Sequence, residues 1–422
     1  MTYHGSHAVP SCRLCGGSLV LSLSLEPTPP ANEFVLTSSK DSLQDEFPLD
    51  IMTCEGCGHV QLGHVVDPER LFRNYVYVSG TSPVFVDHFS RYAESMISRY
   101  RLKRGDLVVD VGSNDGTLLS FFKNAGMRVL GVDPAVSIAR AASARGIPTE
   151  PHFFSPDLVD RLVLEHGQAH LVVANNVMAH AEGLRTIVQA VFKMMRSDGA
   201  FAFEVSYLPD VINGGLFDTV YHEHLSYHHV DPLVPFFESE DMRLIDVERI
   251  NTHGGSIRCH VKRRTARPAL DTVSDLRIGE RSMGLHCPAL GPSSFNPAVW
   301  SRFGESIRRA GSALTSRLRD MKASGMSIAG YGAPAKATTL MYQFGLGPED
   351  LDFIVDDSPL KAGLFTPGKH IPVLPSSAIR DRMPDAVVIL AWNFADSIVQ
   401  KLGWYRELGG KIITPLPDFR ET

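Results

Sequence analysis

Apolar stretches separated by glycine turns recur through the middle of the chain. One apolar strand followed by a glycine turn and a helix is predicted within 106–119. Further strands are expected at 128–134, 170–177 and 200–205, with helical segments between them. Strands that alternate with helices are typical of a mainly parallel sheet covered by helices. The pattern therefore predicts a Rossmann-like α/β domain.

A second alternation of strands and helices follows a linker rich in Gly, Pro and Ser at 284–294. A long helix is predicted from about Pro297 to Lys322. A strand, a glycine turn and a helix then follow at 327–336, and more strands are expected at 352–357, 372–374 and 386–391. We expect a second α/β unit in the last third of the chain.

The first part of the chain predicts a smaller module. Short strands are expected at 19–25 and 33–36, and this module has too few apolar residues to fold without a further stabilising element. The composition of the chain changes after this module. Apolar residues then recur at helical spacing and predict a helix, namely Phe85, Phe89, Tyr92 and Met96. We therefore expect three domains, at 1–72, 73–290 and 291–422.

Four of the six cysteines form two Cys-x-x-Cys pairs near the start of the chain. The pairs are Cys12 with Cys15 and Cys54 with Cys57, a spacing that lets four thiolates hold one tetrahedral Zn²⁺. Four cysteine ligands leave no coordination position open for water, so we expect a structural zinc ion that stabilises the small module. A redox-active Cys-x-x-Cys is the competing interpretation, although it needs only one pair.

Composition restricts the partners. The net charge of -6 argues against a nucleic-acid surface, which needs clustered Lys and Arg. No apolar run reaches the roughly 20 residues that span a membrane, and the polar start lacks a signal-peptide core. We expect a cytoplasmic, monomeric protein that binds neither nucleic acid nor membrane.

The first glycine turn and the second strand predict a nucleotide-like ligand. Gly112 and Gly116 let the backbone approach a ligand, and Asp133 ends the second strand, where an acid can bind ribose hydroxyls. This turn resembles that of class I S-adenosylmethionine-dependent methyltransferases, and a dehydrogenase is the alternative. The candidate cofactor residues at the carboxyl ends of these strands are Asp110, Gly112, Asn114, Asp115, Gly116, Asp133, Pro134, Asn175 and Asn176.

Titratable side chains are densest in 217–229, which holds two tyrosines, four histidines and two carboxylates. Tyr221, His222, Glu223 and His224 combine bases, an orienting carboxylate and a phenolic donor, the groups that proton transfer needs. A histidine-rich surface loop or a metal site is the competing interpretation, but no zinc-hydrolase spacing is present. We expect this segment to lie at the mouth of the cofactor sheet.

Six motifs together carry a resemblance that runs over nearly the whole chain. They are the two Cys-x-x-Cys pairs, Asp-Val-Gly-Ser-Asn-Asp-Gly, Ala-Asn-Asn-Val-x-x-His, Tyr-His-Glu-His-Leu-Ser-Tyr, His-Gly-Gly-Ser-x-Arg and Gly-Tyr-Gly-Ala-Pro-Ala-Lys. In this order they resemble the sugar C-methyltransferases of deoxysugar biosynthesis. The resemblance implies a zinc-binding domain, a methyl-donor domain and a C-terminal α/β domain. It also implies a nucleotide-linked 4-ketosugar as substrate, commonly a thymidine diphosphate sugar, methylated most naturally at C-3.

The resemblance also implies roles for individual residues. His224 would be the base, with Tyr221, Glu223 and His180 beside it and either Tyr75 or Tyr77 closing the site. Sequence alone leaves open whether His222 or His224 faces the cleft. The candidate substrate-binding residues are Tyr331, Gly332 and Lys336 of the second glycine turn, with His253 and Arg258.

The chemistry agrees with carbon methylation. A ketone acidifies the neighbouring C–H group, so one positioned histidine can generate an enolate for the sulfonium methyl group of S-adenosylmethionine. The second glycine turn could bind pyrophosphate, bind a nicotinamide or be empty. An NADPH-dependent ketoreductase acting on the same ketosugar is therefore one alternative, and a non-catalytic binding protein is another.

Overall fold

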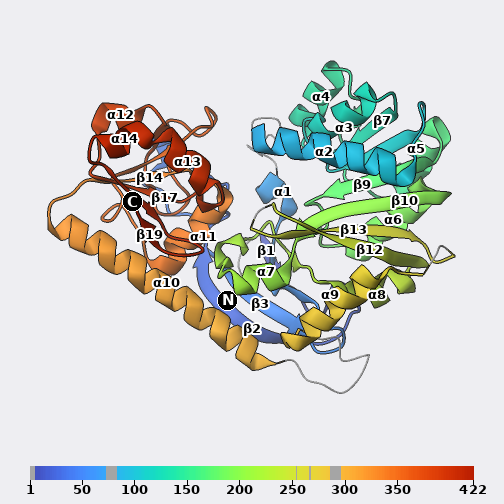
Figure 1. Ribbon diagram of the computed structural model, residues 1–422, viewed down its shortest axis with the longest axis horizontal. Helices are drawn as coiled ribbons and strands as arrows, with labels where there is room; N and C mark the ends of the chain where they lie inside the picture. Colours follow the sequence, from blue (N-terminus) through green and yellow to red (C-terminus); the bar gives the residue numbers. More distant parts are fainter. Residues whose placement is uncertain (1–4, 73–82, 253, 266–267, 286–295) are drawn as a thin grey trace.

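The computed structural model describes residues 5–72, 83–252, 254–265, 268–285 and 296–422. Figure 1 shows a central α/β part, a C-terminal α/β part and a small N-terminal β part that lies between and below them. Among the described helices, none combines the length and apolar character that crossing a membrane demands.

The N-terminal part contains a four-stranded antiparallel sheet with the order β11-β4-β3-β2. Its strands are β2 (Leu19–Thr28), β3 (Phe47–Cys54), β4 (Val60–Leu62) and β11 (Ser226–Tyr227). A second ladder pairs β1 (Ser6–Ala8) with β5 (His64–Val66), and the short helix α1 (Pro68–Phe72) follows. The sheet is thus completed by β11, which belongs to residues 217–229, the histidine-rich segment.

The strand predicted at 33–36 is not formed. Only Val35 makes a β-bridge there, and its partner is Phe365 of the C-terminal part. The true partner of β2 is β3, where alternate residues such as Leu49 and Ile51 are buried. This prediction was wrong because Val35 belongs to a loop that finds its hydrogen-bond partners in another part of the chain.

The central sheet has seven strands in the order β12-β13-β10-β9-β6-β7-β8, with β13 antiparallel to both neighbours. In chain order the strands are β6 (Leu107–Val111), β7 (Arg128–Val132), β8 (Thr149–Glu150), β9 (Ala169–Asn175), β10 (Met195–Ser206), β12 (Met242–Ile250) and β13 (Ser256–Arg263). The Rossmann-like α/β domain that the alternation of strands and helices predicts is therefore present.

Helices cover both faces of this sheet, because successive side chains of a strand point to opposite faces. Val109 belongs to the core cluster on one face, which also includes residues of α5 (Pro156–His166), α6 (Leu184–Met194), α8 (Val230–Ser239) and α9 (Asp271–Ser282). Val108 belongs to the cluster on the opposite face, which includes residues of α2 (Pro83–Tyr100), α3 (Thr117–Asn124) and α4 (Val136–Ala144). The predicted helix at Phe85 to Met96 is α2.

The C-terminal sheet has six strands in the order β16-β15-β14-β17-β18-β19, all parallel except β19. The strands are β14 (Ile328–Tyr331), β15 (Phe353–Asp356), β16 (Val373–Pro375), β17 (Ala386–Ile389), β18 (Lys411–Thr414) and β19 (Arg420–Glu421). Its helices are α11 (Ala335–Phe344), α12 (Ala378–Arg382), α13 (Ala395–Lys401) and α14 (Gly403–Glu407). The second α/β unit is therefore present.

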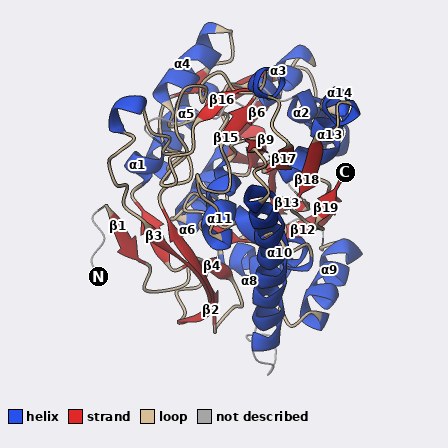
Figure 2. Cartoon of the chain, turned by 90° about the vertical axis from the view of Figure 1, so that its left-hand side faces the viewer, coloured by secondary structure: helices blue, strands red, loops and turns tan. Residues whose placement is uncertain are grey.

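The three parts share one apolar core around the long helix α10 (Pro297–Ala323), which runs past the N-terminal sheet in Figure 2. Leu25 of β2, Phe303 of α10 and Leu340 of α11 belong to this core. Phe217 of the histidine-rich segment also belongs to it, next to helix α7 (Leu208–Asn213). The segment therefore lies where all three parts meet.

Candidate active site

The glycine turn after β6 forms one wall of a cavity at the carboxyl ends of the central strands. Gly112 has φ of +70°, and a Cβ atom there would lie 2.4 Å from Cγ2 of Val177. Gly116 has φ of +76° and is the N-cap residue of α3. Both positions require glycine, since this left-handed region strains other residues. The turn therefore leaves the backbone at the start of α3 open to a ligand.

Asp133, at the end of β7, lies opposite this turn. Its carboxylate accepts hydrogen bonds from the backbone N–H of Asn114 at 2.8 Å and of Ala135 at 2.9 Å. Burial raises the pKa of Asp133, and these two N–H donors oppose that rise. A carboxylate has about four lone-pair positions, so Asp133 is fixed in place and can still accept ribose hydroxyls.

Unpaired polar atoms mark the same cavity as a ligand site. The Oγ atom of Ser113 and both amide atoms of Asn175 are buried and have no hydrogen-bond partner in the described parts of the chain. Leaving a buried polar group unpaired costs about 1–3 kcal/mol, so a ligand that pairs with these atoms is expected. The cavity measures about 500 Å³, within the usual range for small-molecule sites.

Eight of the nine predicted cofactor residues line this cavity, and Gly116 stands behind it at the start of α3. The eight are Asp110, Gly112, Asn114, Asp115, Asp133, Pro134, Asn175 and Asn176. His180, expected in the catalytic group, lines it as well. The polar edge and the two glycine positions fit S-adenosylmethionine, whose ribose and amino-acid groups need hydrogen-bond partners.

Sequence reasoning missed the aromatic walls of the cavity. Phe85 and Phe89 were predicted only as apolar positions of a helix, yet both line the cavity, as do Phe153 and Phe154 after β8. The available signal was two adjacent aromatic residues directly after the third strand, with the Phe153 side chain 56% exposed. A flat purine ring suits such apolar walls.

His224, Tyr221 and His180 form a compact cluster beside the cavity. The Nδ1 atom of His224 lies 2.7 Å from the carbonyl oxygen of Thr219. Because a carbonyl oxygen only accepts, Nδ1 carries the hydrogen and Nε2 carries the lone pair of the neutral ring. Nε2 accepts from the O–H group of Tyr221 at 2.8 Å. The hydrogen bonds with Thr219 and Tyr221 therefore hold neutral His224 with its lone pair on Nε2, the tautomer in which Nε2 can act as a base.

His180 completes the cluster from the loop after β9. Its ring meets the ring of His224 edge to face, with centroids 4.9 Å apart. Desolvation lowers the pKa of His180 to about 4, so its ring is neutral near pH 7. The cluster thus brings a neutral histidine from the cofactor sheet against the histidine predicted to be the base.

His222 and Glu223 point away from this cluster. The Nε2 atom of His222 donates to the carbonyl oxygen of Phe47 at 3.2 Å, and burial lowers the pKa of His222 to about 4. Glu223 accepts from Nδ2 of Asn32 at 2.6 Å, and burial raises its pKa to about 7. Both side chains make these hydrogen bonds with the N-terminal part, whereas the ring of His224 contacts the rings of both Tyr221 and His180.

The four cysteines predicted to bind zinc come together. The Sγ atoms of Cys12 and Cys57 are 3.6 Å apart, those of Cys15 and Cys54 are 3.4 Å apart, and all four lie within 4.8 Å of one another. Four sulfurs about 2.3 Å from one tetrahedral zinc ion are about 3.8 Å apart, so the arrangement fits a zinc ion. The backbone N–H of Gly56 points to Sγ of Cys54 at 3.3 Å, as expected for a thiolate ligand.

At the second glycine turn, burial lowers the pKa of Lys336, and the nearby charge of Asp218 in the histidine-rich segment partly opposes this. The Nζ atom of Lys336 lies 4.4 Å from the centre of the Trp392 ring and has no hydrogen-bond partner among the described residues. Tyr331 donates to Asp357 at 3.3 Å, and a Cβ atom at Gly332 would lie 2.4 Å from Cβ of Ala391. Lys336 is therefore buried between the C-terminal part and the histidine-rich segment, and its role in substrate binding stays a prediction.

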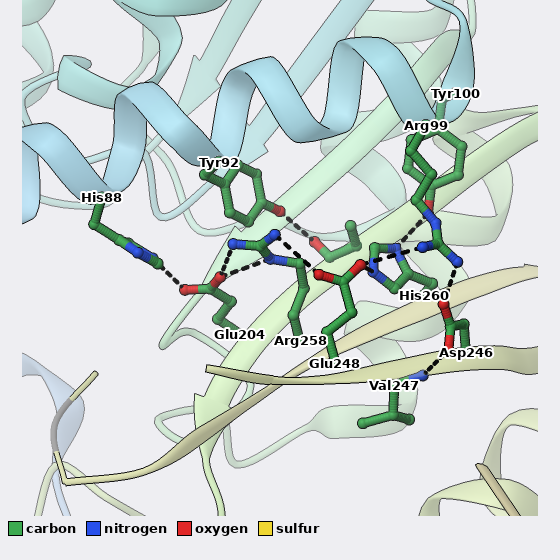
Figure 3. A network of polar contacts seen from close by, with 11 residues as sticks. His88, Tyr92, Arg99, Tyr100, Glu204, Asp246, Val247, Glu248, Arg258 and His260 are labelled. Carbon is green, nitrogen blue, oxygen red and sulfur yellow. Dashed lines mark hydrogen bonds and ion pairs between the residues drawn. The ribbon is translucent and has the colours of Figure 1, made fainter. Parts of the chain in front are cut away.

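Arg258, predicted to bind substrate, lies in a buried ion-pair network beneath α2 (Figure 3). Its Nε atom donates to Glu204 at 2.7 Å, and its guanidinium lies 4.3 Å from the Tyr92 ring. His88 of α2 binds the other oxygen of Glu204 at 2.7 Å. The network fixes α2, whose first turns carry the cavity residue Phe85. His253, Tyr75 and Tyr77 lie outside the described residues.

Comparison with known proteins agrees with this arrangement. A zinc binding domain matches residues 12–72, a methyltransferase domain matches 109–201, and a C-methyltransferase C-terminal domain matches 251–417. Among solved structures, the magnesium protoporphyrin IX methyltransferase of Synechocystis with bound S-adenosylmethionine is 15% identical, with a TM-score of 0.32 over 43% of this chain and 81% of that chain.

One curated relative matches almost end to end. The C-methyltransferase NovU of Streptomyces niveus is 33% identical over 417 residues, which cover 98% of this chain and 96% of the relative. The malonyl-[acyl-carrier protein] O-methyltransferase of Enterobacter lignolyticus is 26% identical over 113 residues, 27% of this chain and 44% of the relative. With its zinc-binding cysteines and its S-adenosylmethionine cavity, the chain belongs to the C-methyltransferase family and is an S-adenosylmethionine-dependent methyltransferase.

Proposed function

We propose that this protein methylates the carbon next to the ketone of a nucleotide-linked 4-ketosugar, with thymidine diphosphate as the nucleotide and C-3 as the position. The observation that supports this most is the His224–Tyr221 pair beside the cofactor cavity, at 2.8 Å from Nε2 to the phenolic oxygen. An oxygen nucleophile needs little activation, whereas a carbon nucleophile requires removal of a C–H proton. A histidine held in its basic tautomer supplies that step.

In the proposed reaction Nε2 of His224 takes the α proton of the ketosugar. Thr219 stabilises the imidazolium, because its carbonyl accepts the Nδ1–H group at 2.7 Å. The phenol of Tyr221 must leave Nε2 to allow this step. The ketone oxygen is then its natural acceptor, and a phenol donor stabilises the enolate oxygen.

The residues of the cavity would hold the methyl donor. Asp133 would accept the ribose hydroxyls, while Asn175 would pair with a polar group of the donor. When bound, S-adenosylmethionine supplies an electrophilic methyl group. His180 and Leu225 line the same cavity, so the base lies next to the donor site.

We propose that a second cavity binds the nucleotide half of the substrate. It measures about 300 Å³ and lies between the start of α2 and the 392–397 region of the C-terminal part. Phe85, Trp392 and Phe394 offer aromatic surfaces for a base, and Arg420 offers a cation for phosphate. Nucleotide binding is therefore proposed at the edge of the C-terminal unit. The buried Lys336 keeps its contacts inside the protein.

The test is an assay with methyl-labelled S-adenosylmethionine and a panel of nucleotide-linked sugars. The panel contains 4-ketosugars and the corresponding 4-hydroxy sugars, and His224→Asn is the control enzyme. We expect label in the ketosugars alone, and NMR should place the new methyl group on carbon next to the ketone. Label on oxygen, or on the hydroxy sugars, would contradict the proposal. NADPH consumption with the ketosugar would favour a ketoreductase.

A further inference from the structure

Arg13 occupies an unusual position between two zinc-binding cysteines. Its Nε and Nη2 atoms are buried, and neither finds a hydrogen-bond partner within the parts of the chain described. Burying a guanidinium with unpaired donors is costly, so stability alone does not account for it.

The hydrogen bonds that the Arg13 guanidinium does make reach the histidine-rich segment, which contains His224. Its Nη1 atom donates to the carbonyl oxygen of Leu62 at 3.1 Å and to that of Leu225 at 3.0 Å. Leu225 follows His224 in the chain and lines the cofactor cavity. The guanidinium therefore bridges a strand of the zinc-binding part to the residue after the proposed base.

The backbone of Leu225 is also fixed through its N–H group. Its N–H group donates to the carbonyl oxygen of Ala179 at 2.7 Å, and Ala179 directly precedes His180. The backbone N–H of Leu62 donates to the carbonyl oxygen of Leu225 at 3.0 Å. Leu225 is thus the point where the zinc-binding part, the segment of His224 and the segment of His180 are joined.

The backbone of Arg13 is held equally firmly. Its N–H group donates to Oε1 of Gln61 at 2.8 Å, and Nε2 of Gln61 donates to the carbonyl oxygen of Ser11 at 3.3 Å. The cysteines on either side, Cys12 and Cys15, fix the turn when zinc is bound. The position of the guanidinium therefore depends on the folded zinc site.

We propose that Arg13 is a positioning residue, through which the zinc-binding turn sets the place of His224 relative to His180 and the cofactor cavity. The zinc ion then contributes to the geometry of catalysis as well as to folding. A shift of about 1 Å in a reacting group can cost about 100-fold in rate, so one guanidinium that fixes Leu225 has a measurable effect. The rate prediction rests on the proposed function.

The chain offers a matched control in Arg185. Its Nη2 atom donates to the carbonyl oxygen of Leu14 at 2.8 Å, in the same zinc-binding turn. Arg185 comes from α6, and its other polar partners there are Ser239 and Glu240. Arg13→Met and Arg185→Met therefore both remove an arginine contact to the zinc-binding part. Only Arg13→Met removes the contact to the catalytic segment.

The first measurement is NMR of ring-labelled histidine, with the His224 signal identified by its loss in His224→Asn. We expect Arg13→Met to retain zinc by metal analysis and to shift the His224 signal. Arg185→Met should leave that signal in place, and Arg13→Lys, which restores a donor, should return it toward the parent position. If Arg13→Met does not fold, Arg13→Gln replaces it.

The second measurement is turnover with the ketosugar. We expect kcat to fall about 10- to 100-fold in Arg13→Met with KM little changed, and to remain near the parent value in Arg185→Met. An unshifted His224 signal with full kcat in a zinc-loaded Arg13 variant would overturn the inference. The NMR measurement needs no substrate, so it still decides the role of Arg13 if the parent methylates no ketosugar.

Discussion

The phenolic oxygen of Tyr221 lies 2.8 Å from Nε2 of His224, and the ring of His224 is turned so that its Nδ1–H group reaches the carbonyl oxygen of Thr219. The two residues are three positions apart, and a turn closes between them because the N–H of His224 donates to the carbonyl oxygen of Tyr221 at 2.8 Å. A base and a phenol donor are thus placed by one local turn. Their separate roles can be tested one side chain at a time.

Replacing His224 by Asn should lower methylation about 10²- to 10⁴-fold, the usual loss when a positioned base is removed, while both ligands still bind. With S-adenosylhomocysteine in the donor site, the parent should exchange deuterium from D₂O into the α position of the ketosugar, and His224→Asn should not. NMR of the recovered sugar measures this exchange.

Two further variants make this test specific. His222→Asn removes a histidine that faces Phe47, so exchange should continue. Tyr221→Phe should retain exchange at a reduced rate if the phenol stabilises the enolate. Exchange that stops in Tyr221→Phe and continues in His224→Asn would assign proton removal to the phenol.

Asp133→Ala should weaken binding of S-adenosylmethionine. Hydrogen bonds to a charged acceptor contribute about 1.5–3 kcal/mol, which corresponds to about 10- to 100-fold in Kd. Asp106→Ala is the control, because Asp106 precedes β6 at the opposite end of the strand from the cavity. Equal affinities of the parent and Asp133→Ala by calorimetry would place the donor elsewhere.

Much of the fold was predictable because local rules decide it. The strand, glycine turn and helix at Gly112 can be predicted from neighbouring residues alone. The same holds for the Cys-x-x-Cys motif of Cys12 and Cys15, whose sulfur atoms lie in one cluster. Parallel strands then bring Asp133 and Asn175 to one edge of the sheet, as predicted from their place at strand ends. The cofactor cavity follows from these local features.

The remaining features depend on contacts between distant parts of the chain. Sequence could not show that β11 pairs with β4 of the zinc-binding part, and this pairing turns His222 towards Phe47. Similarly, Arg258 was expected at the substrate, but its partner Glu204 lies on the neighbouring strand β10. A histidine or an arginine can be a structural residue or can bind a ligand, and the fold determines which groups lie nearest to it.

Cys54→Ser should remove the structural zinc and destabilise the N-terminal part. Three remaining thiolates bind zinc more weakly than four, and metal binding contributes directly to folding in small zinc domains. Metal analysis and thermal unfolding measure the two effects. Cys259→Ala, at a buried cysteine of β13 outside the cluster, is the control and should retain zinc. A zinc-loaded Cys54→Ser protein of parent stability would contradict the assignment.

Glu204→Gln should destabilise the protein by up to about 3–5 kcal/mol, because it removes the nearer carboxylate partner of the buried Arg258 and leaves Glu248, at 3.5 Å. Denaturant unfolding measures the change. Glu165→Gln breaks an exposed pair with Arg161 and should leave stability nearly unchanged, because solvent screens such a pair. Since Glu204 also binds His88 of α2, the variant should lower donor affinity through Phe85. Equal stabilities of the two variants would show that the network contributes little.

The buried titratable groups should give opposite pH effects on stability. Burial lowers the pKa of His228 to about 4, so the unfolded chain, with a histidine pKa near 6.5, binds more protons between these values. The stability that neutral His228 contributes is complete above about pH 6.5 and is lost as pH falls towards 4. Burial raises the pKa of Glu223 from 4.5 to about 7, so its contribution is instead lost as pH rises from 4.5 to 7.

Variants at these two residues should therefore change the pH dependence of unfolding in opposite directions. In His228→Gln, the free energy of unfolding should rise less steeply between pH 4 and 6.5, by up to about 1.4 kcal/mol per pH unit. In Glu223→Gln, which can still accept from Asn32, it should rise more steeply between pH 4.5 and 7. Denaturant unfolding across this range, with zinc retention checked at each pH, measures both slopes. Parallel curves for the parent and both variants would show that neither residue titrates differently in the folded and unfolded states.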